Sequence, residues 1–270
     1  MKQNFQKAAD NYKAVCINDV RKLSEEKSIS MRDAQIAFLS QGIVPYRYIG
    51  NVRLFGIDGQ IKLLKSKVCV IGCGGLGGTI CELLTRLGVG NLVIVDPDVF
   101  EEHNLNRQLL CTEDDIGKPK VACAKKRIQS VNSAAVVIAI QSKATEENID
   151  ELISGCSLCM DALDNIQTRL VLEKACLDQQ IPLIHGAIGD AQFQVSAICE
   201  NAVLENVYGQ QDSDTLAGSP APTVTVCAAL QTAEAVKIIT GMGETLNGDL
   251  LVGNWLYNDY VFFNIVGSDS

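Results

Sequence analysis

The stretch KVCVIGCGGLGGTICELLTRLGVGNLVIVDPD, residues 67–98, decides the fold. Its first apolar run, 68–71, predicts a strand that is buried on both faces. Five glycines follow within 72–78. Because glycine has no Cβ, they allow the backbone to turn sharply and to approach a ligand closely. We expect a helix over 79–87 directly after this turn and a second strand over 92–95, which ends at Asp96.

This order of strand, glycine turn, helix and strand indicates a nucleotide site. The N-terminus of the helix offers unpaired N–H groups and a positive dipole end to a phosphate. Asp96 follows the glycines by about 20 residues, where an acid accepts hydrogen bonds from ribose hydroxyls. A glycine turn that serves only close packing of the helix on the strand is the alternative.

Strands and helices alternate through the rest of the chain. The run 195–198 alternates as an antiparallel strand does, and two final strands are expected over 249–266. This pattern predicts an α/β fold with a doubly wound, mostly parallel, Rossmann-like sheet and antiparallel C-terminal strands. The 270 residues, 47% of them hydrophobic, are enough for one large domain with a small appendage. We therefore expect a helical N-terminal extension over 1–45 and a nucleotide-binding domain over 46–270.

Charge and hydropathy count against several classes of function. The net charge of −9 disfavours general affinity for nucleic acid or for anionic membranes, which both attract basic proteins. No signal segment opens the sequence, and no run of apolar residues is long enough to span a bilayer. We therefore expect a cytoplasmic protein.

The sequence contains 11 cysteines, scattered through apolar segments. Without a secretory signal, they are expected to be reduced thiols. The one CxxC motif, at Cys156 and Cys159, falls in an apparent buried strand and has no second pair. This motif therefore predicts packing in the core and no zinc.

Polar side chains follow the predicted strands at the ends where ligands of such sheets bind. Asp96 ends one strand, Asn104 and Arg107 come soon after it, Lys120 opens the next helix, and Asp164 follows a later strand. Two cations, a helix N-terminus and an acid that holds Mg²⁺ suit a triphosphate better than a nicotinamide. An NAD-dependent oxidoreductase is the weaker alternative.

Four segments resemble a known family. GCGGLGG, VDPDVFEEHNLNRQLL, IGKPK and MDALDN, in this order, resemble the MoeB/ThiF/HesA adenylyltransferases, which are relatives of the ubiquitin-activating enzymes. The resemblance covers about residues 46–265. It implies adenylation of the C-terminal glycine carboxylate of a small ubiquitin-like sulfur-carrier protein ending in Gly-Gly, using ATP and Mg²⁺ and releasing pyrophosphate. It also implies a homodimer.

The resemblance further implies roles for individual residues. Arg107 and Lys120 would act in catalysis on the phosphates, and Asp164 would act there by binding Mg²⁺. The residues that it implies for nucleotide binding are Gly72, Gly74, Gly75, Gly77, Asp96, Asp98, Asn104, Arg107, Gln108 and Lys120.

The sequence departs from the family pattern in three places. Gly50 stands where many relatives carry an arginine that reaches the ATP of the partner subunit, which leaves weakened activity open. The paired CxxC zinc ligands of some relatives are missing, so we expect no zinc. The polar segment 201–222 lacks the catalytic cysteine of thioester-forming relatives, and Cys227 just after it is in an apolar context. We therefore favour adenylation without a covalent enzyme–carrier step.

Two other functions remain open at this point. One is adenylation of another carboxylate, on a modified tRNA base or a peptide terminus, and the other is carrier binding without catalysis. His185 also has two possible roles: it either borders the channel for the carrier tail or is a hydrogen-bonded structural residue. His103 is expected to position its own segment rather than to act as an acid or base.

Overall fold

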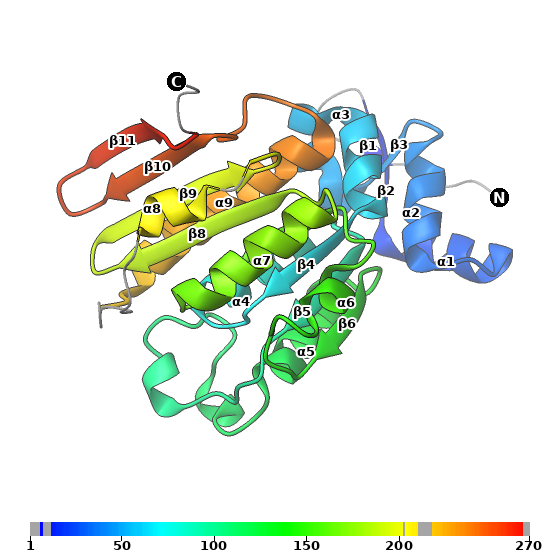
Figure 1. Cartoon of the computed structure of the whole chain (residues 1–270). Coiled ribbons are helices and arrows are strands. Elements are labelled where there is room, and N and C mark those ends of the chain that lie inside the picture. The colour runs from blue at the N-terminus through cyan, green and yellow to red at the C-terminus, as the bar shows by residue number, and fades with distance from the viewer. Residues whose placement is uncertain (1–5, 8–11, 202, 210–217, 267–270) are drawn as a thin grey trace.

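A computed structural model describes residues 6–7, 12–201, 203–209 and 218–266 (Figure 1). Eight strands of this part of the chain form one sheet, in the order β11-β10-β9-β8-β7-β4-β5-β6. Five strands pair in parallel: β4 (Lys67–Ile71), β5 (Asn91–Val95), β6 (Val136–Ile140), β7 (Leu158–Asp161) and β8 (Leu183–Gly189). Three more add antiparallel pairs: β9 (Gln192–Ile198), β10 (Asp249–Asn254) and β11 (Asp259–Asn264). The predicted fold class is confirmed.

The winding of the sheet reverses between β4 and β7. From β4 the chain adds β5 and β6 on one side, and then returns to add β7 and β8 on the other side. The connections after β4 and after β7 therefore leave the sheet in opposite directions. In open α/β sheets, ligands bind in the crevice that opens at this point, outside the carboxyl ends of the strands.

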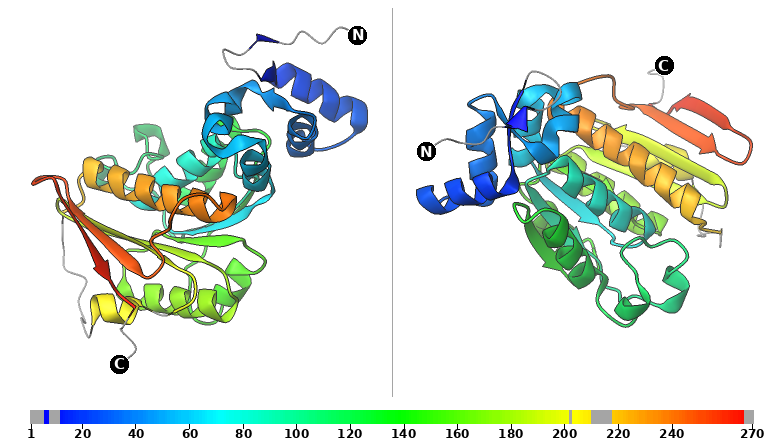
Figure 2. Two further views of the ribbon diagram at one scale, coloured as in Figure 1. Left: turned by 90° about the horizontal axis from the view of Figure 1, so that it is seen from above. Right: turned by 180° about the vertical axis from the view of Figure 1, so that it is seen from behind.

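Helices cover both faces of the sheet, as the two views of Figure 2 show. One layer holds α3 (Ile49–Lys65), α4 (Gly75–Leu87), α5 (Lys120–Val131) and α9 (Ala221–Thr240), and the other holds α6 (Ile149–Ile153), α7 (Ile166–Asp178) and α8 (Leu204–Tyr208). Strand β4 contributes to both cores. Val68 and Val70 pack under the first layer, and Cys69 and Ile71 pack under the second, because successive side chains of a strand point to opposite faces.

Helix α4 begins at Gly75, four residues before the predicted start. Gly75, Gly77 and Gly78, which the sequence assigns to a turn, lie in the first turn of this helix. A Cβ on Gly77 would lie 1.8 Å from the carbonyl oxygen of Gly72, so the turn fits only because it has no side chains. Close packing of α4 on β4 thus outweighs the low helix propensity of glycine.

The N-terminal extension contains α1 (Ile17–Lys27) and α2 (Met31–Leu39), and the Ser30 side chain caps α2 by accepting from the Asp33 N–H. The expectation of helices alone was incomplete, because β1 (Gln6–Lys7), β2 (Lys13–Val15) and β3 (Ile43–Pro45) form a second sheet. These strands are too short for a sequence period to show them.

Tyr48 joins the extension to the main domain. Its ring is fully buried. Its hydroxyl donates to Gln35 of α2 (3.3 Å) and accepts from Asn132, which follows α5 (3.2 Å). Arg47 beside it donates to the Asn132 side chain (2.7 Å). Gly50, in the first turn of α3, is exposed and has open space around it.

The segment 201–222 is less irregular than the sequence suggests. Helix α8 occupies its start, and α9 begins at Ala221. Residues 202 and 210–217 of this segment lie outside the described residues. Where the chain is described, it contains no helix with the length and apolar character needed to cross a membrane.

Candidate nucleotide-binding site

The glycine turn lies at the reversal point of the sheet, after β4. Gly74 is the N-cap of α4 and, as a glycine, has no side chain that could accept a hydrogen bond from this helix end. The first N–H groups of a helix have no partner within the helix, so here they can bind an anion such as phosphate. Gly72 has a φ of +99°, and a Cβ there would lie 2.4 Å from the Ala162 carbonyl oxygen. Gly72 and Gly77 are therefore required for packing as well.

Asp96, at the end of β5, holds the glycine turn in place. One oxygen of its buried carboxylate accepts from the Cys73 N–H (2.6 Å), and the other accepts from the Asp98 N–H (2.8 Å). Burial raises the pKa of Asp96, and these two N–H groups oppose the increase. Each carboxylate oxygen can accept a further hydrogen bond. Asp96 is therefore equipped both to shape the turn and to accept from ribose hydroxyls.

Lys120 and Asp98 form an ion pair next to this turn. The Lys120 ammonium donates to the Asp98 carboxylate at 2.9 Å, and the Lys120 side chain is only 9% exposed. The Lys120 N–H also donates to the Asp98 carbonyl (3.0 Å). The structure thus brings together two residues that the sequence placed in the site and fixes a cation at the N-terminus of α5.

Gln108 supplies an acceptor that has no partner among the described residues. Its side chain is buried against Gly74, whose added Cβ would lie 3.5 Å from Nε2, and its Oε1 atom makes no hydrogen bond. An unsatisfied buried acceptor costs free energy, which a ligand donor at this position would recover. Arg107, the preceding residue, packs beside Gly75. Its guanidinium donates to the His103 carbonyl (3.1 Å) and to Asn106 (2.8 Å).

Asn104 is buried, but its side chain is used within its own turn. The amide oxygen accepts from the Glu101 N–H (3.0 Å), and the amide nitrogen lies 3.0 Å from Nε2 of His103. His103 and Asn104 therefore shape the segment that carries Arg107 and Gln108. Direct contact of Asn104 with a nucleotide stays a prediction.

Asp164 lies in the loop between β7 and α7. Ala162 of this loop packs against Gly72, so the loop runs next to the glycine turn. Asp164 is exposed, and its carboxylate accepts from Asn165 (3.3 Å). Mg²⁺ commonly binds one or two protein carboxylates together with substrate phosphates, and this single exposed acid fits that donor set. In the described residues, no group of three or more His, Cys, Asp or Glu is arranged to hold a metal, so any Mg²⁺ here would depend on ligands from the substrate as well.

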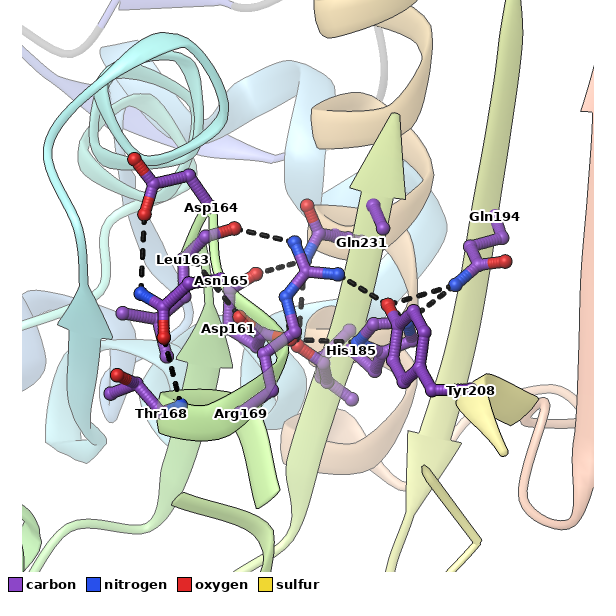
Figure 3. Close-up of polar contacts among 12 residues, drawn as sticks. Asp161, Leu163, Asp164, Asn165, Thr168, Arg169, His185, Gln194, Tyr208 and Gln231 are labelled. Carbon is purple, nitrogen blue, oxygen red and sulfur yellow. Dashed lines mark hydrogen bonds and ion pairs between the residues drawn. The ribbon is translucent and has the colours of Figure 1, made fainter. Parts of the chain in front are cut away.

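A buried polar network lies behind the Asp164 loop (Figure 3). Asp161, the last residue of β7, lies beside His185 of β8 because the register pairs Met160 with Ile184 one residue earlier. His185 Nδ1 is 2.7 Å from the Asp161 carboxylate, and both side chains are completely buried. Gln231 of α9 donates to the Asp161 carbonyl at 2.7 Å.

The network continues to Arg169 of α7 and Tyr208 of α8. Arg169 donates to the Tyr208 hydroxyl, which lies 3.2 Å from His185 Nε2. Burial disfavours the charged Asp161 carboxylate, but Arg169 and His185 beside it lower its pKa. Burial lowers the pKa of His185, which keeps the ring neutral, and raises the pKa of Tyr208 to about 12. His185 is therefore a hydrogen-bonded structural residue here, which was one of its two predicted roles.

Sequence reasoning missed most of this network. Asp161 carried a signal, since it is a charged residue that ends an apolar strand and stands three positions before Asp164. No sequence pattern marked Arg169 or Tyr208 as part of the network, because their partners lie on other helices and strands.

Most of the cysteines are buried, and Cys156, Cys159 and Cys227 are packing residues. Cys227 is completely buried in α9 with its sulfur 3.7 Å from the Ala187 carbonyl, and burial raises the pKa of its thiol. Cys156 and Cys159 are buried in the second core. A raised pKa leaves little thiolate, so Cys227 is a poor nucleophile.

Comparisons with known proteins agree with this geometry. The ThiF family matches residues 47–267. The SAMP-activating enzyme E1 of Haloferax volcanii is 34% identical over 210 residues, which are 73% of this chain and 75% of that protein. The sulfur carrier protein ThiS adenylyltransferase of Bacillus subtilis is 38% identical over 195 residues, 69% of this chain and 58% of that protein. The molybdopterin-synthase adenylyltransferase of Salmonella typhimurium is 31% identical over 208 residues, 74% and 84% of the two chains.

Solved structures show the same fold. PaaA superposes with a TM-score of 0.71 at 25% identity, covering 81% of this chain and 72% of PaaA. MccB of E. coli superposes with a TM-score of 0.72 at 21% identity, covering 82% and 73% of the two chains. The chain therefore belongs to the ThiF family, and it is an adenylyltransferase of that family.

Proposed function

We propose that this protein uses ATP to adenylate the C-terminal glycine carboxylate of a small ubiquitin-like sulfur-carrier protein and releases pyrophosphate. One observation carries the proposal. The open N-terminus of α4, the Asp98–Lys120 pair and the Asp164 loop all lie at the reversal point of a single sheet. Relatives that are named as adenylyltransferases of sulfur carriers support the substrate class.

The chemistry suits these residue types. One carboxylate oxygen of the carrier attacks the α-phosphorus, a new P–O bond forms, and the bond from this phosphorus to the bridging oxygen breaks to release pyrophosphate. A carboxylate is already ionised at neutral pH, so the step needs no general base. Bringing an anion up to a polyanion is the difficulty, and Arg107 and Lys120 reduce it by neutralising phosphate charge and holding the reactants in line.

Asp164 would hold Mg²⁺, which supplies further charge neutralisation on the phosphates when it is bound. The glycine turn and Gln108 would bind the nucleotide, and Asp96 would accept from its ribose. We further propose a homodimer in the cytoplasm, with residues 1–45 as a separate unit that docks through Tyr48, and no covalent enzyme–carrier intermediate.

ATP–pyrophosphate exchange tests this function, measured with and without a carrier protein that ends in Gly-Gly. Exchange that depends on the carrier is expected. Arg107→Ala and Asp164→Ala should each reduce it by about 100-fold or more, because each removes a group that stabilises charge in the transition state. Asp178→Ala, at the exposed far end of α7, is the matched control and should exchange like the wild type. Absence of exchange with carriers of this type, or normal exchange in both site variants, would contradict the proposal.

A further inference from the structure

The loop that carries Asp164 is held by a buried ion pair. Asp161 accepts from the Leu163 N–H at 3.0 Å, and Arg169 donates to the Leu163 carbonyl. Both backbone polar groups of Leu163 are therefore fixed by one acid and one guanidinium, as Figure 3 shows. Asp164 is the next residue, so the direction in which its side chain leaves the loop depends on this pair.

His185 and Tyr208 complete the arrangement, and one set of proton positions accounts for the hydrogen bonds that they make with Asp161 and Arg169. His185 Nδ1–H donates to Asp161 (2.7 Å), which leaves Nε2 as an acceptor for the Tyr208 hydroxyl (3.2 Å). The tyrosine oxygen then accepts from Arg169 and from Gln194 (3.0 Å). These hydrogen bonds are connected in series, so Tyr208 holds Arg169 and His185 in the orientations that keep the Asp164 loop in place.

The orientation of Arg169 indicates that placement, rather than stability, is what the pair provides. Its Nε lies 3.6 Å from the Asp161 carboxylate and, although it is buried, makes no hydrogen bond within the part of the chain that the structure describes. The guanidinium instead directs its two terminal nitrogens to Leu163 and to Tyr208. Buried ion pairs are often no more stable than apolar residues of the same volume. A pair that leaves one donor unsatisfied is therefore a poor way to stabilise a core.

We propose that Tyr208 is a positioning residue, which acts through Arg169 and His185 to fix Asp164 for a magnesium–nucleotide complex. This inference rests on the proposed function, because it needs a nucleotide bound with Mg²⁺. Beyond that function, we infer that α8, which lies far along the chain from the glycine turn, affects the affinity of the site for the magnesium complex of ATP.

Calorimetric titration with a non-hydrolysable ATP analogue tests the proposal, first with Mg²⁺ and then in EDTA. Tyr208→Phe removes only the hydroxyl. It should weaken binding of the magnesium complex about fivefold, which is what one hydrogen bond typically contributes, and leave binding in EDTA unchanged. Tyr257→Phe is the matched control, because Tyr257 is 69% exposed in the β10–β11 turn. It should bind both forms like the wild type.

His185→Asn is the second variant, and it keeps a donor toward Asp161 while removing the acceptor for Tyr208. It should bind the magnesium complex about fivefold more weakly and show unchanged binding in EDTA. This variant keeps the test decisive if Tyr208→Phe fails to fold. If the wild type and both variants bind the magnesium complex with equal affinity, the network only packs the core and the positioning role is wrong. The proposed function would not be affected by that result. A wild-type protein that binds no nucleotide would overturn the proposed function and this inference together.

Discussion

Two glycines of the turn, Gly72 and Gly77, have a packing role that is separate from any ligand. The space where their Cβ atoms would lie is occupied by backbone, at 2.4 Å and 1.8 Å. The two interpretations of the turn, nucleotide binding and helix–strand packing, therefore do not exclude each other. Gly72 and Gly77 let α4 approach β4, and this approach leaves the N–H groups at the start of α4 open.

Gly77→Ala should destabilise the protein strongly. The added methyl group would overlap the Gly72 carbonyl, and overpacking of this kind costs about 1–3 kcal/mol, here at the upper end of that range. Gly50→Ala is the control, since a Cβ at Gly50 meets nothing within 4 Å and α3 tolerates alanine well. Urea unfolding of both variants measures the difference, and equal midpoints would contradict the packing role.

Helix α7 begins at a cap that also belongs to the Asp164 loop. Asn165 accepts from the Thr168 N–H at 2.9 Å, and its side-chain nitrogen donates to Asp164. The cap of α2 is chemically similar, with Ser30 accepting from the Asp33 N–H at 3.0 Å, but it lies in the extension. Both caps stabilise their helices, but only the Asn165 cap also contacts a predicted site residue. Comparing the two therefore distinguishes an effect on stability from an effect on the position of Asp164.

Asn165→Ala and Ser30→Ala should each cost about 1 kcal/mol of unfolding free energy, because each leaves a helix N–H group without its acceptor. Only Asn165→Ala should also weaken binding of the magnesium–ATP complex. Thermal unfolding measures the first effect, and titration with the nucleotide measures the second. A loss of nucleotide affinity in Ser30→Ala equal to that in Asn165→Ala would show that both act through global stability.

The molecule as a whole should respond to its nucleotide. A ligand that binds only the folded state at 100 times its Kd stabilises that state by about 2.7 kcal/mol. For a chain of this size, that corresponds to an increase in Tm of about 5 °C or more. We expect this increase with ATP and Mg²⁺ and no increase with NAD⁺, measured by calorimetry. The opposite result would favour the oxidoreductase that the glycine turn alone allows.

Local sequence was sufficient for the central strands and for the polar residues that follow them. The predicted strands over 68–71 and 92–95 each differ by one residue from β4 and β5. These strands are buried on both faces, so each is a continuous apolar run that needs no partner to be recognised. Asp96 follows β5 directly, and Asp164 comes three residues after the end of β7. Strand ends of a parallel sheet meet at one edge, so the sequence order alone placed these two acids at the same edge.

The tertiary structure was needed for everything that depends on contact between distant segments. The start of α4 at Gly75 follows from packing against Gly72, which outweighs propensity. The contact of Asp161 with His185 follows from the register of two strands, and the contact with Tyr208 follows from the position of α8. Propensity and periodicity act over a few neighbouring residues, whereas these hydrogen bonds join side chains that only the folded sheet brings together.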